Sequence, residues 1–139
     1  MQIRLSDYTA DWIRMYDEEI TILKQIYGDE IIQYEHFGST SVPGLKAKPI
    51  IDIICIVHDT TRIDSFNDTM TALGYKVAGE YGIPGRRLFS KGGENRTHHI
   101  HMYPFAHPEI KRHLVFRDYL RVHPDEAQRY ARLKEQLAQ

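Results

Sequence analysis

The chain has 139 residues, the size of one ordinary domain, and can bury a core without disulfides or a structural metal. Its 18 basic and 19 acidic residues give a formal charge of −1, so no global field attracts nucleic acid or an acidic membrane. The longest apolar run, residues 49–57, is interrupted by Asp52 and is far shorter than the roughly 20 residues of a membrane span. We therefore expect one domain over residues 1–139 of a cytoplasmic protein, with neither membrane nor nucleic acid as a partner.

The first half of the chain predicts a helix, a strand, a loop and a second strand. Helical spacing places apolar residues on one face of a helix that begins after Thr9 and ends at Gly28: Trp12, Tyr16, Ile20, Leu23 and Tyr27. A short strand over residues 31–37 follows. Hydroxyl residues, glycines and prolines in residues 38–49 indicate a loop with room for one helical turn. Residues 50–57 are nearly all β-branched, which is typical of a central strand covered on both faces.

The second half predicts a helix, three strands and two final helices. An amphipathic helix ends at Gly74, and strands over residues 75–78, 87–91 and 97–103 are joined by glycine-rich turns. The last two helices begin at Pro108 and Pro124, where proline suits the first helical position. The final helix is expected to turn three residues inward: Tyr130, Leu133 and Leu137. The predicted fold is α/β (α+β), with a short mixed sheet flanked by helices and two C-terminal helices.

Asp52 is the first candidate functional residue, because it is an acid among isoleucines. An unpaired carboxylate in such a strand would cost several kcal/mol or take up a proton. Its partner is either a basic side chain, which would make it structural, or a metal with its phosphate ligand. Acid inside a buried strand is rare, so we favour the functional interpretation.

The loop before Asp52 has the composition of a phosphate site. Gly38 leaves its backbone amide unobstructed, and Ser39, Thr40 and Ser41 supply three hydroxyls. A chain that turns into a helix here would present these groups to an anion. The alternative is a hydroxyl-capped turn that needs no ligand. Gly-Ser at the end of one strand with Asp inside the next favours phosphate.

Two histidines supply candidate metal or catalytic ligands for Asp52. Alternation places His99 and His101 on one face of the strand over residues 97–103. Such a pair can chelate one metal ion or contact one phosphate, or can be two solvated side chains on an exposed strand. Placed against Asp52, the pair would form a mixed nitrogen and oxygen ligand set.

Three cations complete the candidate phosphate site. Arg87 and Lys91 share a face of the preceding strand, and Lys48 lies just before the Asp52 strand. Arginine binds phosphate in a bidentate manner, and lysine adds a mobile charge. A solvated edge strand explains Arg87 and Lys91 equally well. Lys48 could pair with either Asp52 or the substrate.

Together these motifs resemble the GrpB-like family of bacterial proteins, which is largely uncharacterised. The resemblance rests on His36-Phe37-Gly38-Ser39-Thr40-Ser41-Val42-Pro43-Gly44-Leu45 followed by Lys48-Pro49-Ile50-Ile51-Asp52. Further matches are Gly85-Arg86-Arg87, His99-Ile100-His101 and the run from His113 to Arg121. It implies a nucleotidyltransferase-like fold in which a Gly-Ser pair lies beneath nucleotide phosphates and acids on the next strand hold Mg²⁺. A related domain fused to dephospho-CoA kinase suggests nucleotide or coenzyme chemistry.

The sequence departs from that superfamily pattern at Ile54, where a second carboxylate belongs. Two-metal transfer needs carboxylates that hold both cations. One softer ion such as Mn²⁺ or Zn²⁺ fits Asp52 with His99 or His101 better than two Mg²⁺ ions do. The expected cofactor of this chain is a divalent metal ion, Mg²⁺ or Mn²⁺ ahead of Zn²⁺.

Two functions follow as hypotheses. The first is a metal-dependent nucleotidyltransferase or phosphoryl-transfer enzyme acting on a nucleotide or coenzyme-like phosphate. The second is a non-catalytic module that binds such a ligand in a degenerate site, which Ile54 favours. The expected partner is a small phosphate-bearing molecule. Self-association through Tyr8, Trp12 and Tyr16 stays open, because core packing explains these aromatic residues equally well.

Overall fold

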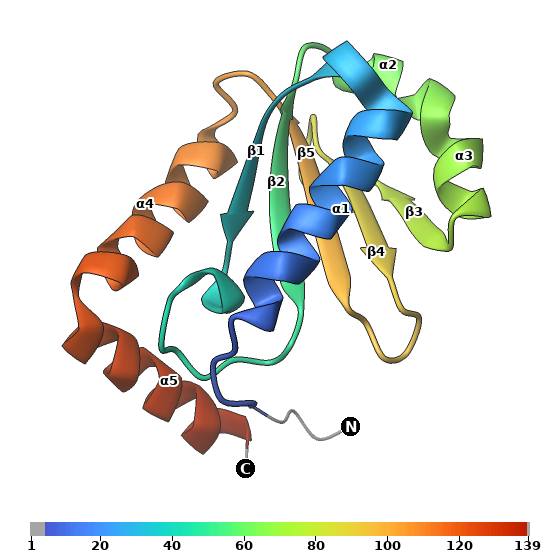
Figure 1. The fold of residues 1–139 in the computed structure, drawn as a ribbon. Coiled ribbons are helices and arrows are strands. Elements are labelled where there is room, and N and C mark those ends of the chain that lie inside the picture. The colour runs from blue at the N-terminus through green and yellow to red at the C-terminus, as the bar shows by residue number, and fades with distance from the viewer. Residues whose placement is uncertain (1–4, 139) are drawn as a thin grey trace.

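A computed structural model describes residues 5–138 and contains five helices, five strands and three short 3₁₀ turns within that range (Figure 1). The helices are α1 (Asp11–Tyr27), α2 (Thr60–Ile63), α3 (Asn67–Ala72), α4 (Pro108–Val122) and α5 (Pro124–Ala138). The strands are β1 (Ile31–Phe37), β2 (Ile51–Val57), β3 (Tyr75–Gly79), β4 (Arg87–Lys91) and β5 (His98–Pro104). The 3₁₀ turns are η1 (Gly28–Glu30), η2 (Ser39–Ser41) and η3 (Asp64–Phe66). This element order confirms the predicted fold class.

The five strands form one mixed sheet in the order β1-β2-β5-β4-β3. β2 and β5 are parallel, and the other three neighbouring pairs are antiparallel. β2 is therefore an interior strand, as its run of β-branched residues predicts. β5 lies between β2 and β4, which brings two strands far apart in sequence side by side near the candidate acid.

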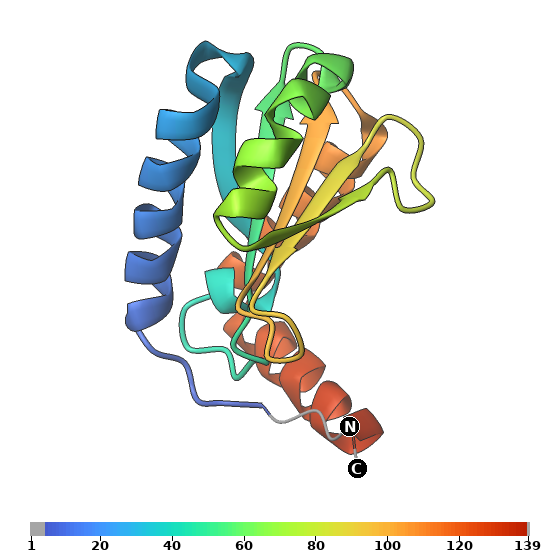
Figure 2. The same ribbon diagram turned by 90° about the vertical axis from the view of Figure 1, so that its right-hand side faces the viewer.

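The two faces of the sheet carry different helices (Figures 1 and 2). We call the face that packs against α1 and α3 the α1 face; it contributes Ile51, Ile53, Ile100 and Met102 to the main core. We call the other face the α4 face; there Ile54, Ile56 and Tyr103 pack with Ile110 of α4. Residues alternate between the faces along each strand, so one strand serves both cores.

α1 begins and packs largely as its sequence predicts. The Thr9 hydroxyl accepts a hydrogen bond from the Asp11 amide at 3.2 Å, and Gly28 follows the helix with a φ of +54°. Trp12 and Leu23 are buried in the main core. The Trp12 side chain therefore packs in the core of this chain.

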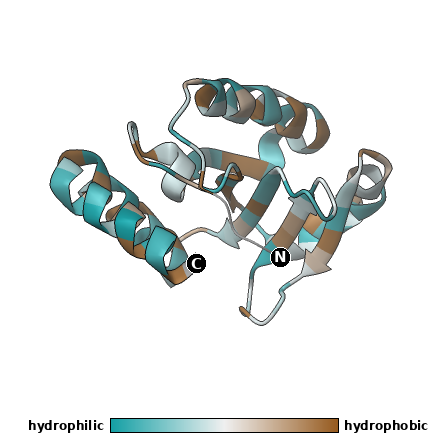
Figure 3. Ribbon diagram, turned by 90° about the horizontal axis from the view of Figure 1, so that it is seen from below, coloured by the Kyte–Doolittle hydropathy of each residue, from teal (hydrophilic) through white to brown (hydrophobic). Residues whose placement is uncertain are grey.

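The prediction that Leu133 and Leu137 face inward is wrong, since they are 54% and 77% exposed. α5 instead buries the small residues Ala127 and Ala131 against Val42, Leu45 and Leu120. In Figure 3 the helix that leads to the C-terminus is mostly hydrophilic, unlike the strands. Small residues let α5 approach the loop after β1 closely, which places Lys134 beside that loop.

None of the helices described between residues 5 and 138 is long and apolar enough to cross a membrane.

Candidate functional site

The end of β1 brings Gly38 against Asp52. Phe37, the last residue of β1, pairs with Asp52 in β2, so the chain at Gly38 passes next to the carboxylate. Gly38 has a φ of +74°, and a Cβ there would lie 2.6 Å from Asp52 Oδ2. Only glycine meets both conditions without strain. The contact between the turn and the acid is therefore built into the backbone.

The predicted phosphate-binding hydroxyls have different roles in the η2 turn. The Ser41 hydroxyl donates to the Gly38 carbonyl oxygen at 2.5 Å, and the Thr40 hydroxyl donates to the Ile50 carbonyl oxygen at 3.0 Å. Both side chains are buried. They hold the shape of the turn, whereas the partly exposed Ser39 hydroxyl lies on the wall of the pocket described below.

His36 supports this turn from the α1 face. Its Nε2 lies 2.9 Å from Thr40 Oγ1, whose only hydrogen is directed at a carbonyl, so His36 donates this bond from Nε2–H. Its ring stacks on Tyr16 at a centroid distance of 4.9 Å. Burial and the nearby Arg121 and Arg117 guanidinium groups lower the pKa of His36 to about 4, so the ring is neutral at pH 7. The sequence analysis missed this support.

Asp52 and His99 form a partly exposed acid–imidazole pair at the centre of the candidate site. They are register partners in the parallel β2–β5 pair, so both point to the α4 face. Asp52 Oδ1 lies 3.6 Å from His99 Nδ1, and the two side chains are 26% and 27% exposed. Ile54, where a second acid would stand, is fully buried. The site thus presents one carboxylate and one imidazole to solvent.

His101 shares that face but lies deeper. It packs edge-on against Phe37 at 5.1 Å and near His113 at 6.2 Å, and its Nδ1 is buried without a hydrogen-bond partner. Burial, with Arg86, His113 and His99 nearby, lowers its pKa to about 3. Among residues 5–138, no three histidine, cysteine, aspartate or glutamate side chains are grouped as a metal site. The structure therefore does not assemble the predicted three-ligand set, and we assign His101 a packing role.

α4 and α5 supply a second wall that the sequence analysis did not identify. Lys134 Nζ lies 3.3 Å from Ser39 Oγ and 4.9 Å from the centroid of the Tyr130 ring. Arg117 Nη1 donates to the His36 carbonyl oxygen at 3.0 Å and lies 3.5 Å from Glu35 Oε1. Helical spacing of His113, Arg117 and Leu120 could have indicated one shared face, but not which strand it covers.

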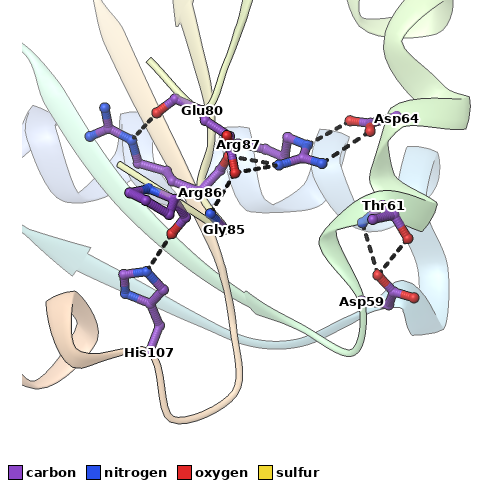
Figure 4. Close-up of polar contacts among 9 residues, drawn as sticks. Asp59, Thr61, Asp64, Glu80, Gly85, Arg86, Arg87 and His107 are labelled. Atoms are coloured by element: carbon purple, nitrogen blue, oxygen red, sulfur yellow. Dashed lines mark hydrogen bonds and ion pairs between the residues drawn. The ribbon is translucent and has the colours of Figure 1, made fainter. Parts of the chain in front are cut away.

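Arg87 and Lys91 are a correction, because they lie on the α1 face, across the sheet from Asp52. β4 pairs Arg87 with Met102 and Lys91 with His98, and both partners belong to that face. Arg87 Nε and Nη2 bind the two carboxylate oxygens of Asp64 at 2.7 and 3.1 Å (Figure 4). Their spacing correctly predicts a shared face, but strand register with β5 decides which face it is.

The assembled pocket has a volume of about 370 Å³ and lies between the η2 turn, the start of β2 and β5, and the two C-terminal helices. Its polar lining includes the carboxylate of Asp52 and five groups that carry or can carry positive charge: Lys48, His99, His113, Arg117 and Lys134. Phe37, Phe116 and Tyr130 add aromatic surface. Such a mixture of apolar walls and a few convergent charges is typical of a small-molecule site.

Comparison with solved structures identifies both a relative and a distant fold match. The crystal structure of the conserved protein GrpB from Enterococcus faecalis matches with a TM-score of 0.95 and 45% identity, over 97% of this chain and 82% of that one. Cid1 poly(U) polymerase bound to MgATP matches with a TM-score of 0.54 and 15% identity, over 82% of this chain and 38% of that one. The second likeness shows a nucleotidyltransferase-like fold.

Sequence comparison gives the family. The UPF0157 protein YqkA of Bacillus subtilis is 52% identical over 131 residues, which are 94% of this chain. This chain covers only 38% of YqkA. The family model described as GrpB protein matches residues 2–139. The chain therefore belongs to the GrpB family.

Proposed function

We propose that this chain is a nucleotidyltransferase-type enzyme that transfers a nucleotidyl or phosphoryl group with one divalent ion. The observation that carries the proposal is the Asp52–His99 pair, which opens beside Gly38 into a pocket lined by fixed positive charges. The fold supports it by analogy alone, since Cid1 was solved with MgATP and with MgGTP.

Phosphate is the ligand that these walls fit. Lys48 and Lys134 line the pocket and form no ion pair with another side chain among the residues described. Lys134 is already directed at the Ser39 hydroxyl, so an oxyanion between them would accept hydrogen bonds from both. Phe116 and Tyr130 lie edge-to-face at 5.3 Å and give a flat base or a coenzyme an apolar surface.

The ligand set at Asp52 fits one Mg²⁺ or Mn²⁺ ion. Mg²⁺ is often held by one or two carboxylates together with substrate phosphates and water. Asp52 supplies the carboxylate, and His99 adds a nitrogen that suits Mn²⁺. When bound, the ion would neutralise charge that develops on the transferred phosphate.

The lysines would share that neutralising role. In phosphoryl transfer the protein acts mainly by positioning and by charge stabilisation. Lys134 and Lys48 reach the pocket from different segments, one from α5 and one from the stretch before β2. Arg117 is shared with Glu35, so its main task is to hold α4 against β1.

Ile54 favours a second candidate function, a binding module without catalysis. Ile54 is fully buried with Phe37, Ile56 and Tyr103, so this position offers no room for a second metal ligand. A single carboxylate still permits binding of a nucleotide or coenzyme. The two candidates share the pocket and differ only in turnover.

Calorimetry with ATP, CTP and coenzyme A, with and without Mg²⁺ or Mn²⁺, tests the ligand binding that both candidate functions require. We expect binding of at least one ligand to strengthen about tenfold or more with metal. Asp52→Asn is expected to remove the metal effect, and Lys134→Ala to weaken binding in both conditions. Lys111→Ala, an exposed lysine outside this pocket, is the matched control.

Phosphorus NMR of the same mixtures separates enzyme from module. New phosphorus signals that disappear in Asp52→Asn support catalysis. Tight binding with unchanged ATP supports the module. Equal ligand binding by Asp52→Asn and the parent, with no metal effect, would refute the role of Asp52.

A further inference from the structure

His113 lines the candidate site but has no chemical task in the proposed function. Its ring lies beside Phe37 of β1, at a centroid distance of 4.8 Å, and its side chain is 26% exposed. It borders both the pocket at Asp52 and a second groove that is lined by α4 alone. The ring therefore lies at an edge of the site that solvent can reach.

Transfer to a hydroxyl acceptor is assisted by a group that takes up the hydroxyl proton, and few lining groups suit this task. Four of them belong to residue types that are protonated in water at pH 7: Lys48, Arg117, Tyr130 and Lys134. Asp52 and His99 hold the metal ion in the proposed function. Among the lining residues that the structure describes, His113 is the side chain left with a lone pair for a proton.

Two neighbours on α4 orient the His113 ring. Its Nε2 lies 3.4 Å from Glu109 Oε2, one helical turn away. That carboxylate is held in turn by Arg112, whose Nε and Nη2 donate to Oε2 at 3.1 and 2.5 Å. A carboxylate beside Nε2 keeps the proton of the neutral ring on that nitrogen. Nδ1 therefore carries the lone pair that can accept a proton.

Charges around the ring decide when it is neutral. Five charged or titratable side chains surround it, from α4, β2, β5 and the residue before β4: Asp52, Arg86, His101, Glu109 and Arg112. Burial and the Arg112 guanidinium lower the pKa of His113 from its ordinary 6.5, and the Glu109 carboxylate opposes this shift. The net shift is downward, so the ring is mostly neutral at pH 7 and can act as a base.

We propose that His113 is the general base of the transfer reaction, held in place by the positioning residues Glu109 and Arg112. This inference rests on the proposed transfer function. A base that is itself oriented by a third group is a recurrent arrangement in enzymes that activate a hydroxyl. The carboxylate fixes the tautomer of the ring and stabilises the imidazolium that forms when the ring takes up a proton.

The step is balanced with a nucleoside triphosphate as donor and a hydroxyl group as acceptor. The hydroxyl oxygen forms a bond to the α-phosphorus. The bond from that phosphorus to its bridging oxygen breaks, and pyrophosphate leaves with the electron pair. The hydroxyl proton passes to His113 Nδ1, and the resulting imidazolium later releases it to solvent. Glu109 and Arg112 take no part in the bond changes.

Nitrogen-15 NMR of the imidazole rings in the whole chain tests the geometry without any ligand. The neutral His113 ring is expected to carry its proton on Nε2 and to have a pKa below 6.5. Glu109→Gln is expected to lower that pKa because it removes an anion, and Arg112→Gln to raise it because it removes a cation. A neutral ring with its proton on Nδ1 would overturn the proposal, because the ring would then offer a proton to the acceptor.

Phosphorus NMR with ATP, Mg²⁺ or Mn²⁺ and glycerol tests the base itself, since glycerol and water both supply a hydroxyl. His113→Gln is expected to slow turnover about 100-fold or more while MgATP binding persists. His113→Asn serves if the first variant does not fold. His123→Gln is the matched control, because it changes an exposed histidine just after the same helix, and its turnover is expected to equal that of the parent.

The pH profile separates catalysis from packing. Turnover is expected to fall as pH drops below the pKa of His113. This acid limb is expected to move to lower pH in Glu109→Gln and to higher pH in Arg112→Gln, whereas a packing role alone would leave it in place. Equal turnover by His113→Gln and the parent would overturn the base and leave the proposed transfer function standing. No turnover by the parent would overturn both together.

Discussion

Two carboxylate–histidine pairs lie on opposite faces of the same sheet. They differ in whether a lysine also forms an ion pair with the carboxylate. On the α1 face, Glu19 lies 3.5 Å from His98 and 3.4 Å from Lys91. On the α4 face, Asp52 lies 3.6 Å from His99. Glu19 is 3% exposed and has a lysine partner, whereas Asp52 is 26% exposed and has none among the residues described.

The difference teaches how one motif serves structure on one face and leaves its carboxylate accessible to a ligand on the other. Burial raises the pKa of Glu19, while the Lys91 ammonium opposes that rise. The Glu19 group is thereby satisfied inside the protein and offers nothing to a ligand. Asp52 keeps free coordination capacity next to positive walls, which is the condition for binding a metal with a phosphate.

Removal of the buried Glu19 carboxylate is expected to have the largest effect on stability. Glu19→Ala leaves Lys91 and His98 without their partner in a mostly buried setting, so we expect a loss of about 3 kcal/mol in the free energy of unfolding. Urea denaturation measures it. Glu18→Ala, on the exposed side of the same helix, is the control and is expected to cost under about 0.5 kcal/mol. Similar losses in both variants would show that the contacts of Glu19 with Lys91 and His98 do not stabilise the fold.

The Gly38 contact gives the next largest effect. Gly38→Ala combines a positive φ with a clash at Asp52 Oδ2, and we expect a loss of about 2–3 kcal/mol. Gly82→Ala, with a φ of +87° and open space around it, is expected to lose only the strain, about 1 kcal/mol. Asp52→Ala in the Gly38→Ala background is expected to recover part of the loss. Purely additive effects in this double-mutant cycle would mean that the contact carries no energy.

The buried His36, which holds the η2 turn, predicts that the stability of the fold depends on pH. Its folded-state pKa of about 4 lies below its ordinary value of 6.5, so the unfolded chain binds the proton first as pH falls. His36 therefore stabilises the fold above pH 6.5, and this contribution is lost between about pH 6.5 and 4. His36→Gln is expected to reduce the slope of stability against pH by up to about 1.4 kcal/mol per unit in this window. An unchanged slope in urea titrations would exclude a neutral buried His36.

The smallest effect on stability is expected from a change at the partly exposed Asp52 carboxylate. Asp52→Asn removes charge from a partly exposed group, so we expect a change within about 0.5 kcal/mol. Thermal unfolding with the same buffer and salt measures it beside Glu19→Gln. A loss for Asp52→Asn as large as that for Glu19→Gln would contradict the contrast between the two faces.

Local patterns predict most of the fold and part of the geometry of the candidate site. Alternation correctly placed Asp52 with Ile54 on one face of β2 and His99 with His101 on one face of β5, and Gly38-Ser39 at a strand end correctly marked the turn. These features depend on neighbouring residues along the chain. The alternation of side chains along a strand is enough to predict which residues of that strand share a face.

The errors came from contacts between distant segments. Arg87 and Lys91 are predicted to belong to the phosphate site but lie across the sheet from it, because their face depends on how β4 pairs with β5, which the sequence of β4 alone does not encode. Lys134 was missed because α5 reaches Ser39 through the small residues Ala127 and Ala131, a close approach that appears only on packing. The exposed Leu133 has the same cause.

Paramagnetic broadening by Mn²⁺ tests the central claim most directly. With ATP present and Mn²⁺ far below the protein concentration, the amide signals of Gly38, Ser39 and Asp52 are expected to broaden first. Asp52→Asn is expected to lose this selectivity, while Glu19→Gln retains it. Selective broadening that persists in Asp52→Asn, or that centres on Glu19 or on acids far from the η2 turn, would contradict a phosphate and metal site at Asp52.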